Sequence, residues 1–182
     1  MYVWFRLLRV AATSRRRGHF RMVDDESRIA LRCLPSDIDM NLHMNNARYM
    51  MLADLGRMDI FFRSGLLSAA RKRGWGPLLG GLQVSYLREI RLWQRFELIS
   101  TVETWEGTQV IGRHRFVFPD GRIAAIIMTT GGVYDFRNRR FLDTGEVAAV
   151  IGNAHPPRPP SEEERAFMAS HQGIRGLAKS FA

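Results

Sequence analysis

One segment of this sequence, residues 47–63, has a helical period and is apolar on two opposite sides. At about 100° per residue, a face of mostly small and medium side chains is formed by Tyr49, Ala53, Gly56 and Ile60. A second stripe of larger side chains lies roughly opposite and comprises Met51, Leu55, Met58 and Phe62. A helix that is apolar on two sides is buried on two sides. We therefore predict a central helix whose small face lets a sheet approach its axis closely.

The rest of the chain contains several segments with the composition of β-strands. Residues 28–34 alternate apolar and basic side chains, and four later runs are rich in β-branched and aromatic residues: 82–87, 96–105, 110–118 and 123–134. These later strands are expected to begin only after the basic, glycine-rich segment 71–81. Turns are expected at residues 106–107 and 119–121, and a bulge or bend at Gly131-Gly132. The order favours an α+β fold with a curved antiparallel sheet wrapped around the central helix.

A chain of 182 residues corresponds to one domain with extensions rather than to two domains. We place the domain at residues 27–152, an N-terminal extension at 1–26, and a proline-rich linker with a C-terminal helix at 153–182. Ser161 and Glu164 have the spacing of a capping box, which predicts the start of that last helix.

The N-terminal extension combines apolar and basic residues. Residues 1–12 are apolar apart from Arg6 and Arg9 and are predicted to form a short amphipathic helix, with further arginines within residues 15–21. The segment is too short and too charged to span a bilayer, and it lacks the pattern of a signal peptide. Two alternatives follow. Residues 1–21 contact an anionic membrane surface, or the helix packs on its own domain or on a partner subunit, which we favour.

The charge balance calls for an anionic partner. The chain has 27 Lys and Arg residues against 18 Asp and Glu residues, a net charge of +9, and nearly all the basic residues are arginine. Arginine suits phosphates and carboxylates, so nucleic acid, anionic membrane and coenzyme A are candidates. No nucleic-acid recognition module is recognisable, so we expect no nucleic-acid partner. The single cysteine, Cys33, excludes an intramolecular disulfide, and we expect a cytoplasmic protein, at most peripheral to a membrane.

The densest polar stretch, residues 37–46, lies between the first strand and the central helix. Asp39, Asn41 and His43 alternate there and offer a carboxylate, an amide and an imidazole, which are the parts of a hydrolytic site. A calcium loop is not supported, because Leu42 and Arg48 stand where such a loop needs glycine and glutamate. The dispersed histidines favour no metal site either. The alternative is a loop whose polar side chains only satisfy turn and capping hydrogen bonds.

The segment 34–49 reads LPSDIDMNLHMNNARY and resembles the signature of the hotdog-fold thioesterases, which include the 4-hydroxybenzoyl-CoA thioesterase-like proteins. The resemblance is closest to the thioesterase superfamily member 6-like branch, and the DxNxHxNN core is also similar to plant acyl-carrier-protein thioesterases. It implies a hotdog fold over residues 27–152. It also implies a base or nucleophile at Asp39, with Asn41 and His43 orienting water and thioester. The implied substrate-binding or supporting residues are Asn45, Asn46 and Tyr49.

The same resemblance implies an acyl-CoA or acyl-carrier-protein thioester as substrate, a role in fatty acid metabolism, no cofactor, and a homo-oligomer. Non-catalytic acyl-binding or lipid-binding proteins also share this fold and are the alternative. An oligomer is expected for a second reason, since the larger apolar stripe of the central helix must be covered. The candidates are a partner subunit, the N-terminal segment, or the acyl chain of the substrate. His114, between two arginines on a strand, is expected to be a surface or ladder residue.

Overall fold

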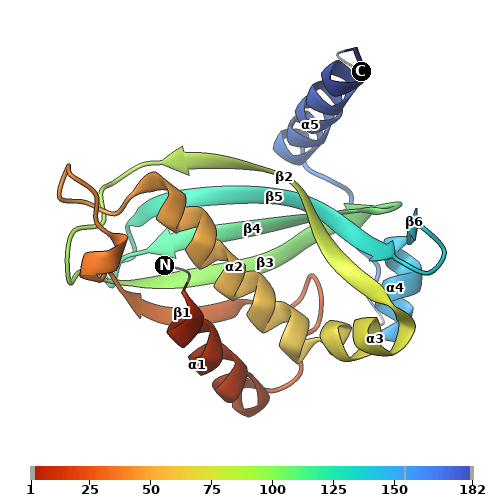
Figure 1. Cartoon of the computed structure of the whole chain (residues 1–182), viewed down its shortest axis with the longest axis horizontal. Coiled ribbons are helices and arrows are strands. Elements are labelled where there is room, and N and C mark those ends of the chain that lie inside the picture. The colour runs from red at the N-terminus through yellow and green to blue at the C-terminus, as the bar shows by residue number, and fades with distance from the viewer. Residues whose placement is uncertain (1–2, 154, 181–182) are drawn as a thin grey trace.

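The computed structural model describes residues 3–153 and 155–180 and confirms the α+β class, with a curled antiparallel sheet around a central helix (Figure 1). The sheet order is β1-β3-β4-β5-β2, with strands Ser27–Arg32, Arg95–Glu106, Gln109–Val117, Ile123–Asp135 and Trp75–Tyr86. A short strand β6, Arg140–Phe141, pairs with β5. The helices α1 to α5 are Trp4–Ser14, Asn46–Arg63, Leu66–Arg73, Thr144–Val150 and Glu162–Ser180.

Helix α2 packs on the sheet through its small face, as predicted. Its N-terminus is capped by Asn45, whose side chain accepts a hydrogen bond from the Ala47 N–H. A methyl group at Gly56 would lie 1.9 Å from Ser100 Oγ on β3. Only glycine therefore allows this approach of helix to sheet, which fixes the position of α2 across the concave side.

Helix α1 packs beside α2, next to the edge strand β1 (Figure 1). Val10 of α1 and Leu55 of α2 are buried in one core cluster, against which Leu7 and Phe62 also pack. Leu55 and Phe62 of the larger apolar stripe are thus covered by the N-terminal segment, one of the three candidates expected from the sequence, whereas Met58 lines an internal cavity. None of the described helices is long and apolar enough to cross a membrane.

Two arginines of α1 bind the backbone of the edge strand β1. Arg6 donates to the carbonyl oxygen of Arg32 at 2.9 Å, and Arg9 donates to that of Ala30 at 2.7 Å. Arg6 also forms a two-pronged ion pair with Asp37, at 3.0 and 2.6 Å. The N-terminal extension is therefore fastened both to the sheet edge and to the polar loop that follows β1.

The remainder of the extension is held by a buried carboxylate. Arg17, in the 3-10 turn η1 (Arg15–Arg17), lies 2.9 Å from an oxygen of Asp59 on α2, which also accepts a hydrogen bond of 2.6 Å from Ser27. Arg15 and Arg16 are exposed. Met1 and Tyr2, the first residues of the predicted helix, lie outside the described residues.

The segment 71–81 is more regular than the sequence indicates. Helix α3 occupies its first part and ends before Gly74, whose φ of 74° reverses the chain. Strand β2 then begins at Trp75, well before the expected start at residue 82, and pairs along its length with β5. The expectation was wrong here because pairing with an adjacent strand outweighs the low strand propensity of glycine.

A bulge or bend was expected at Gly131-Gly132 in β5, and the structure has an irregularity there, which lies in the neighbouring strand β2. The pairing of β2 with β5 slips between Leu79 and Gly81, opposite Gly131 and Thr130. A methyl group on Gly131 would lie 2.4 Å from the Leu78 carbonyl oxygen. The glycine therefore allows the close approach of β2 at the bulge.

The C-terminal segment is anchored by the predicted capping box. The Glu164 N–H donates to Ser161 Oγ at 3.3 Å and the Ser161 N–H donates to the Glu164 carboxylate at 2.8 Å. That carboxylate is buried and pairs with Arg158 at 2.6 Å. Phe167 and Met168 pack near the start of α5 on the sheet, whereas the far end of the helix projects from the domain (Figure 1).

Candidate active site

The polar loop between β1 and α2 folds back on itself through its backbone. The Asp39 N–H donates to the His43 carbonyl and the Leu42 N–H donates to the Asp39 carbonyl, each at 3.1 Å. His43 also forms an isolated β-bridge with Arg91, which ties the loop to the segment before β3. Leu42 has a φ of 61°, in the left-handed region that bulky residues rarely adopt. The loop is therefore a tight, strained turn, of the kind often found at functional sites.

The carboxylate of Asp39 lies at the centre of the loop, with 19% of its side chain exposed. One oxygen accepts a hydrogen bond of 2.9 Å from the Asn41 N–H, and the other lies 3.5 Å from Asn45 Nδ2. His43 Nδ1 is 3.8 Å from the carboxylate, too far for a hydrogen bond without a small movement. The structure thus brings together Asp39, His43 and Asn45.

Asn41 and Asn46 do not add their side chains to this group in the contacts that the structure shows. Asn41 contributes its backbone N–H, and its side chain is exposed. Asn46 is also exposed, and its carbonyl accepts a hydrogen bond of 3.1 Å from the Tyr86 hydroxyl. The predicted roles of the two amides remain predictions.

Tyr49 lies one turn into α2 and is buried among aromatic rings. Its ring centroid is 5.2 Å from that of Tyr86 and 5.0 Å from that of Phe116, both in edge-to-face geometry. Burial raises the pKa of its hydroxyl to about 12, so the phenol stays protonated. The geometry gives Tyr49 a packing role beneath the loop.

Asp37 is a loop residue whose role the sequence did not reveal. It is 1% exposed, receives both prongs of Arg6, and accepts a hydrogen bond of 2.9 Å from the Leu34 N–H. Its carbonyl accepts a further bond from the Asn45 N–H at 2.8 Å. Asp37 therefore holds the loop between β1 and α2. Its carboxylate oxygens accept hydrogen bonds within the protein, which gives Asp37 a structural role and not a catalytic one.

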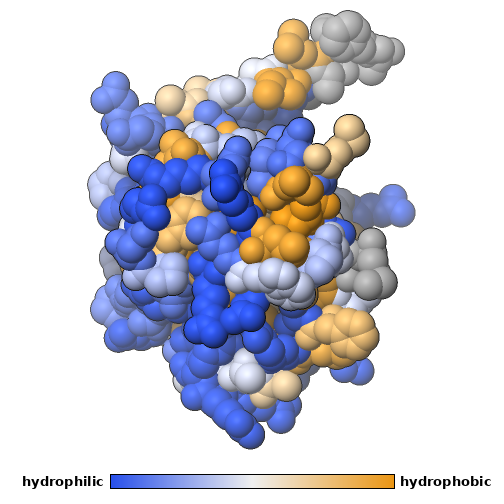
Figure 2. All heavy atoms as spheres, turned by 90° about the vertical axis from the view of Figure 1, so that its left-hand side faces the viewer, coloured by the Kyte–Doolittle hydropathy of each residue, from blue (hydrophilic) through white to orange (hydrophobic). Residues whose placement is uncertain are grey.

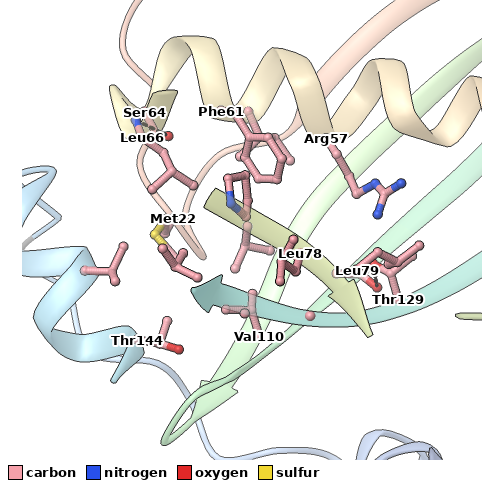
Figure 3. A pocket seen from close by; sticks show the side chains of 18 of the residues that line it. Met22, Arg57, Phe61, Ser64, Leu66, Leu78, Leu79, Val110, Thr129 and Thr144 are labelled. Carbon is pink, nitrogen blue, oxygen red and sulfur yellow. Dashed lines mark hydrogen bonds between the residues drawn. The ribbon is translucent and has the colours of Figure 1, made fainter. Parts of the chain in front are cut away.

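A cavity of about 330 Å³ lies between the second half of α2 and the sheet, near α3 and α4 (Figure 3). Its walls are mainly aliphatic, and Figure 3 shows Arg57, Leu79 and Thr129 at one end and Met22 and Leu66 at the other. The volume is in the range of small-molecule sites. The six predicted site residues are not among those that line it. On α2 the lining begins at Asp54, about 12 Å along the helix from Asn46.

His114 reaches this cavity, and of its two expected placements, at the surface or in a strand ladder, the structure supports the second. It belongs to the strand ladder, but it is 1% exposed and therefore not at the surface. Nδ1 lies 2.8 Å from Ser100 Oγ, and Nε2 lies 3.4 Å from Thr129 Oγ1. Burial, helped by the charge of Arg57, lowers the pKa of the imidazole to about 3, so the ring is neutral. The burial of His114 could have been predicted from the alternation of side chains along β4, since His114 lies on the same face of the strand as Phe116.

The chemistry available at the loop is that of a carboxylate beside the N-terminus of a helix. The partial positive charge of the first turn of α2 favours negative charge nearby, including an oxyanion that forms during a reaction. Within residues 3–153 and 155–180, no group of three or more His, Cys, Asp or Glu side chains is placed to hold a metal ion.

Comparison with known proteins identifies a family and several curated relatives. The family model of the thioesterase-like superfamily matches residues 33–166. Protein THEM6 of Xenopus laevis is 36% identical over 97 residues, which are 53% of this chain and 47% of that protein. The chain spans about half the length of the curated relatives that it matches.

Solved structures show the same fold at low sequence identity. The probable thioesterase YbaW of Escherichia coli has a TM-score of 0.63 and 19% identity, covering 67% of this chain and 93% of YbaW. SAV2348 of Staphylococcus aureus, solved in complex with CoA, has a TM-score of 0.62 and 16% identity, covering 80% of this chain and 94% of its own. The predicted hotdog fold is thereby confirmed.

Proposed function

Because the chain belongs to the thioesterase-like superfamily, we propose that it hydrolyses an acyl thioester, with Asp39 as the base or nucleophile. The observation that carries this proposal is the partly exposed Asp39 carboxylate, which lies beside His43 and Asn45 at the start of α2. A carboxylate in this setting can accept a proton, and the adjacent helix terminus can stabilise an oxyanion.

In the proposed reaction, Asp39 takes a proton from a water molecule as the water oxygen bonds to the thioester carbonyl carbon. The resulting oxyanion is stabilised by the N-terminal end of α2. When the C–S bond breaks, the thiolate leaves and takes up a proton, which gives a carboxylic acid and a free thiol. His43 is the nearest group to shuttle that proton, since its ring lies 3.8 Å from the carboxylate. In the alternative of direct attack, an Asp39 oxygen bonds to the carbonyl carbon, the C–S bond breaks and the thiolate leaves. Water then hydrolyses the resulting anhydride, which releases the acid and restores the Asp39 carboxylate.

We propose acyl-CoA rather than an acyl-carrier-protein thioester as the substrate. Coenzyme A is a polyanion, and the chain has a net charge of +9 supplied almost entirely by arginine. The likeness to SAV2348, solved in complex with CoA, agrees with this proposal. An acyl carrier protein would instead require a larger complementary surface.

We also propose that the protein forms homodimers or tetramers. Strand β2 is an edge of the sheet, and it exposes large apolar side chains at Leu78, Leu79, Leu82 and Tyr86. An edge strand of this kind presents unpaired backbone groups and is a template for pairing with another chain. A second copy of the same chain is the simplest partner.

A non-catalytic acyl-binding role is the second candidate, and one observation favours it. The apolar cavity begins about 12 Å along α2 from the loop, and Asp39 does not line it. A protein that stores or carries an acyl group needs the cavity but not the carboxylate.

The two candidates differ in turnover. Purified protein is assayed against acyl-CoAs of increasing chain length, with detection of the free thiol. We expect turnover, and a loss of at least about 100-fold for Asp39→Asn, because an amide cannot act as a base. Asp120→Asn, in the exposed turn after β4, is the matched control and should retain activity. Saturable acyl-CoA binding without thiol release would support the carrier; near-normal turnover in folded Asp39→Asn would remove Asp39 from the mechanism.

A further inference from the structure

The outward face of α1 carries exposed apolar side chains. Phe5 is 84% exposed, Leu8 is 64% exposed and Trp4 is 60% exposed, whereas Leu7 and Val10 point inward. Positions 5, 8, 12 and 15 follow the helical period, so this face continues through exposed Ala12 to the arginines at its end. A soluble helix usually turns its apolar face inward, yet α1 is apolar on both sides at its start.

The same part of the chain is strongly basic. Residues 3–23 contain six arginines and no acidic residue, although Arg6, Arg17 and Arg21 form ion pairs with aspartates elsewhere in the chain. Arg15 and Arg16, which follow α1, are exposed at the C-terminal end of its outward face. Aromatic and leucine side chains combined with adjacent arginines are the composition of helices that lie in the headgroup region of anionic membranes.

The tip of the site loop presents two more apolar side chains. Met40 is 94% exposed and Leu42 is 76% exposed, and they flank Asn41 next to the candidate base. Figure 2 looks at the end of the molecule that carries this loop and shows apolar side chains standing out from a largely hydrophilic surface. The ion pair between Arg6 of α1 and Asp37 of the loop places the two elements side by side.

We propose that the outward face of α1 and the tip of the site loop together dock on an anionic lipid surface. We call the residues Phe5, Leu8, Met40 and Leu42 the anchor residues. Charge complementarity favours a lipid surface over a second copy of this chain, because the exposed Arg15 and Arg16 attract anionic headgroups and would repel the same residues of a second copy. In this orientation the site loop touches the bilayer, so an acyl-CoA that partitions into the membrane reaches Asp39 from the lipid side.

Vesicle sedimentation tests the surface directly. The full chain is mixed with phosphatidylcholine vesicles that contain or lack phosphatidylglycerol, at low and at high salt. We expect binding to the anionic vesicles at low salt, and weaker binding as salt rises. Phe5→Gln should lower the partition coefficient about tenfold or more, from the loss of one inserted apolar side chain. Arg16→Gln should lower it about fivefold.

The matched control is Ile174→Gln on the projecting helix α5, where the isoleucine is 65% exposed but lies outside the proposed surface. It should leave vesicle binding unchanged. The double variant Met40→Gln, Leu42→Gln tests the contribution of the loop tip to vesicle binding, and circular dichroism verifies that the variant is folded. Equal loss in Ile174→Gln would mean nonspecific adhesion and would overturn the proposal. Absence of binding to anionic vesicles at low salt would also overturn it.

A second copy of the chain as the occupant is distinguished by sedimentation velocity. If Phe5→Gln and Leu8→Gln dissociate an oligomer and leave vesicle binding intact, the surface is a protein interface and the proposal fails. Vesicle binding needs no turnover, so it is decided separately from the proposed hydrolysis. If turnover occurs, Phe5→Gln should slow hydrolysis of a vesicle-bound long-chain acyl-CoA and spare a short-chain acyl-CoA in solution.

Discussion

Replacing His114 should remove a large part of the pH dependence of folding stability. The imidazole has a pKa of about 3 in the folded protein, against about 6.5 in an unfolded chain. Between these values the unfolded state binds the extra proton, so stability falls as the pH falls. The slope is about 1.4 kcal/mol per pH unit, so His114 should make the wild-type protein about 2 kcal/mol less stable at pH 5 than at pH 7.

The measurement is urea unfolding at both pH values for the wild type, His114→Gln and His19→Gln. His114→Gln has no group to titrate, so its stability should change about 2 kcal/mol less between pH 7 and pH 5 than that of the wild type. His19 is exposed and serves as the control, which should behave like the wild type. An equal pH dependence in the wild type and His114→Gln would refute a neutral, buried imidazole.

Three further predictions concern packing, the loop and the substrate. Gly56→Ala should destabilise the protein by about 1–3 kcal/mol or more in urea unfolding, because the methyl group would meet Ser100 Oγ at 1.9 Å. Asp37→Ala should lower the free energy of unfolding by about 3 kcal/mol in the same measurement, since it leaves Arg6, 13% exposed, without its carboxylate partner. An unchanged unfolding midpoint would contradict a structural role for Asp37. The KM for acyl-CoA should rise with ionic strength, whereas that for a short uncharged thioester should not.

The central helix and its packing could be predicted from the sequence because the helical period of this segment and its two apolar sides indicate the same structure. The two apolar sides of α2 predicted burial on two sides, and in the structure the helix packs against both the sheet and α1. The small face predicted close contact with a sheet, and Gly56 is the position where the backbone of α2 approaches the Ser100 side chain of β3. The N-cap of α2 is a local feature of the same kind, since the Asn45 side chain accepts a hydrogen bond from the Ala47 N–H two residues along the chain.

Features that depend on distant partners could not be predicted. The early start of β2 follows from pairing with β5, which outweighs the glycine content of that segment. The pair of Arg6 and Asp37 joins residues 31 positions apart, and nothing in the spacing of either one indicates the other. At the site, the motif gave the order of Asp39, Asn41 and His43, but only the fold shows that the Asn45 side chain comes nearer to the carboxylate than that of His43.

The two edges of the sheet differ, and if copies of the chain joined by strand pairing, this difference would limit their number. Along β1, the guanidinium groups of Arg6 and Arg9 already occupy backbone acceptors, whereas β2 carries exposed leucines. A sheet with one edge strand already hydrogen-bonded to side chains can add a new strand only at its other edge. If two chains paired through their β2 strands, neither would have an open edge strand left, so growth by strand pairing would stop at a two-fold dimer. In such a pair, the arginines of α1 would prevent further chains from adding at β1.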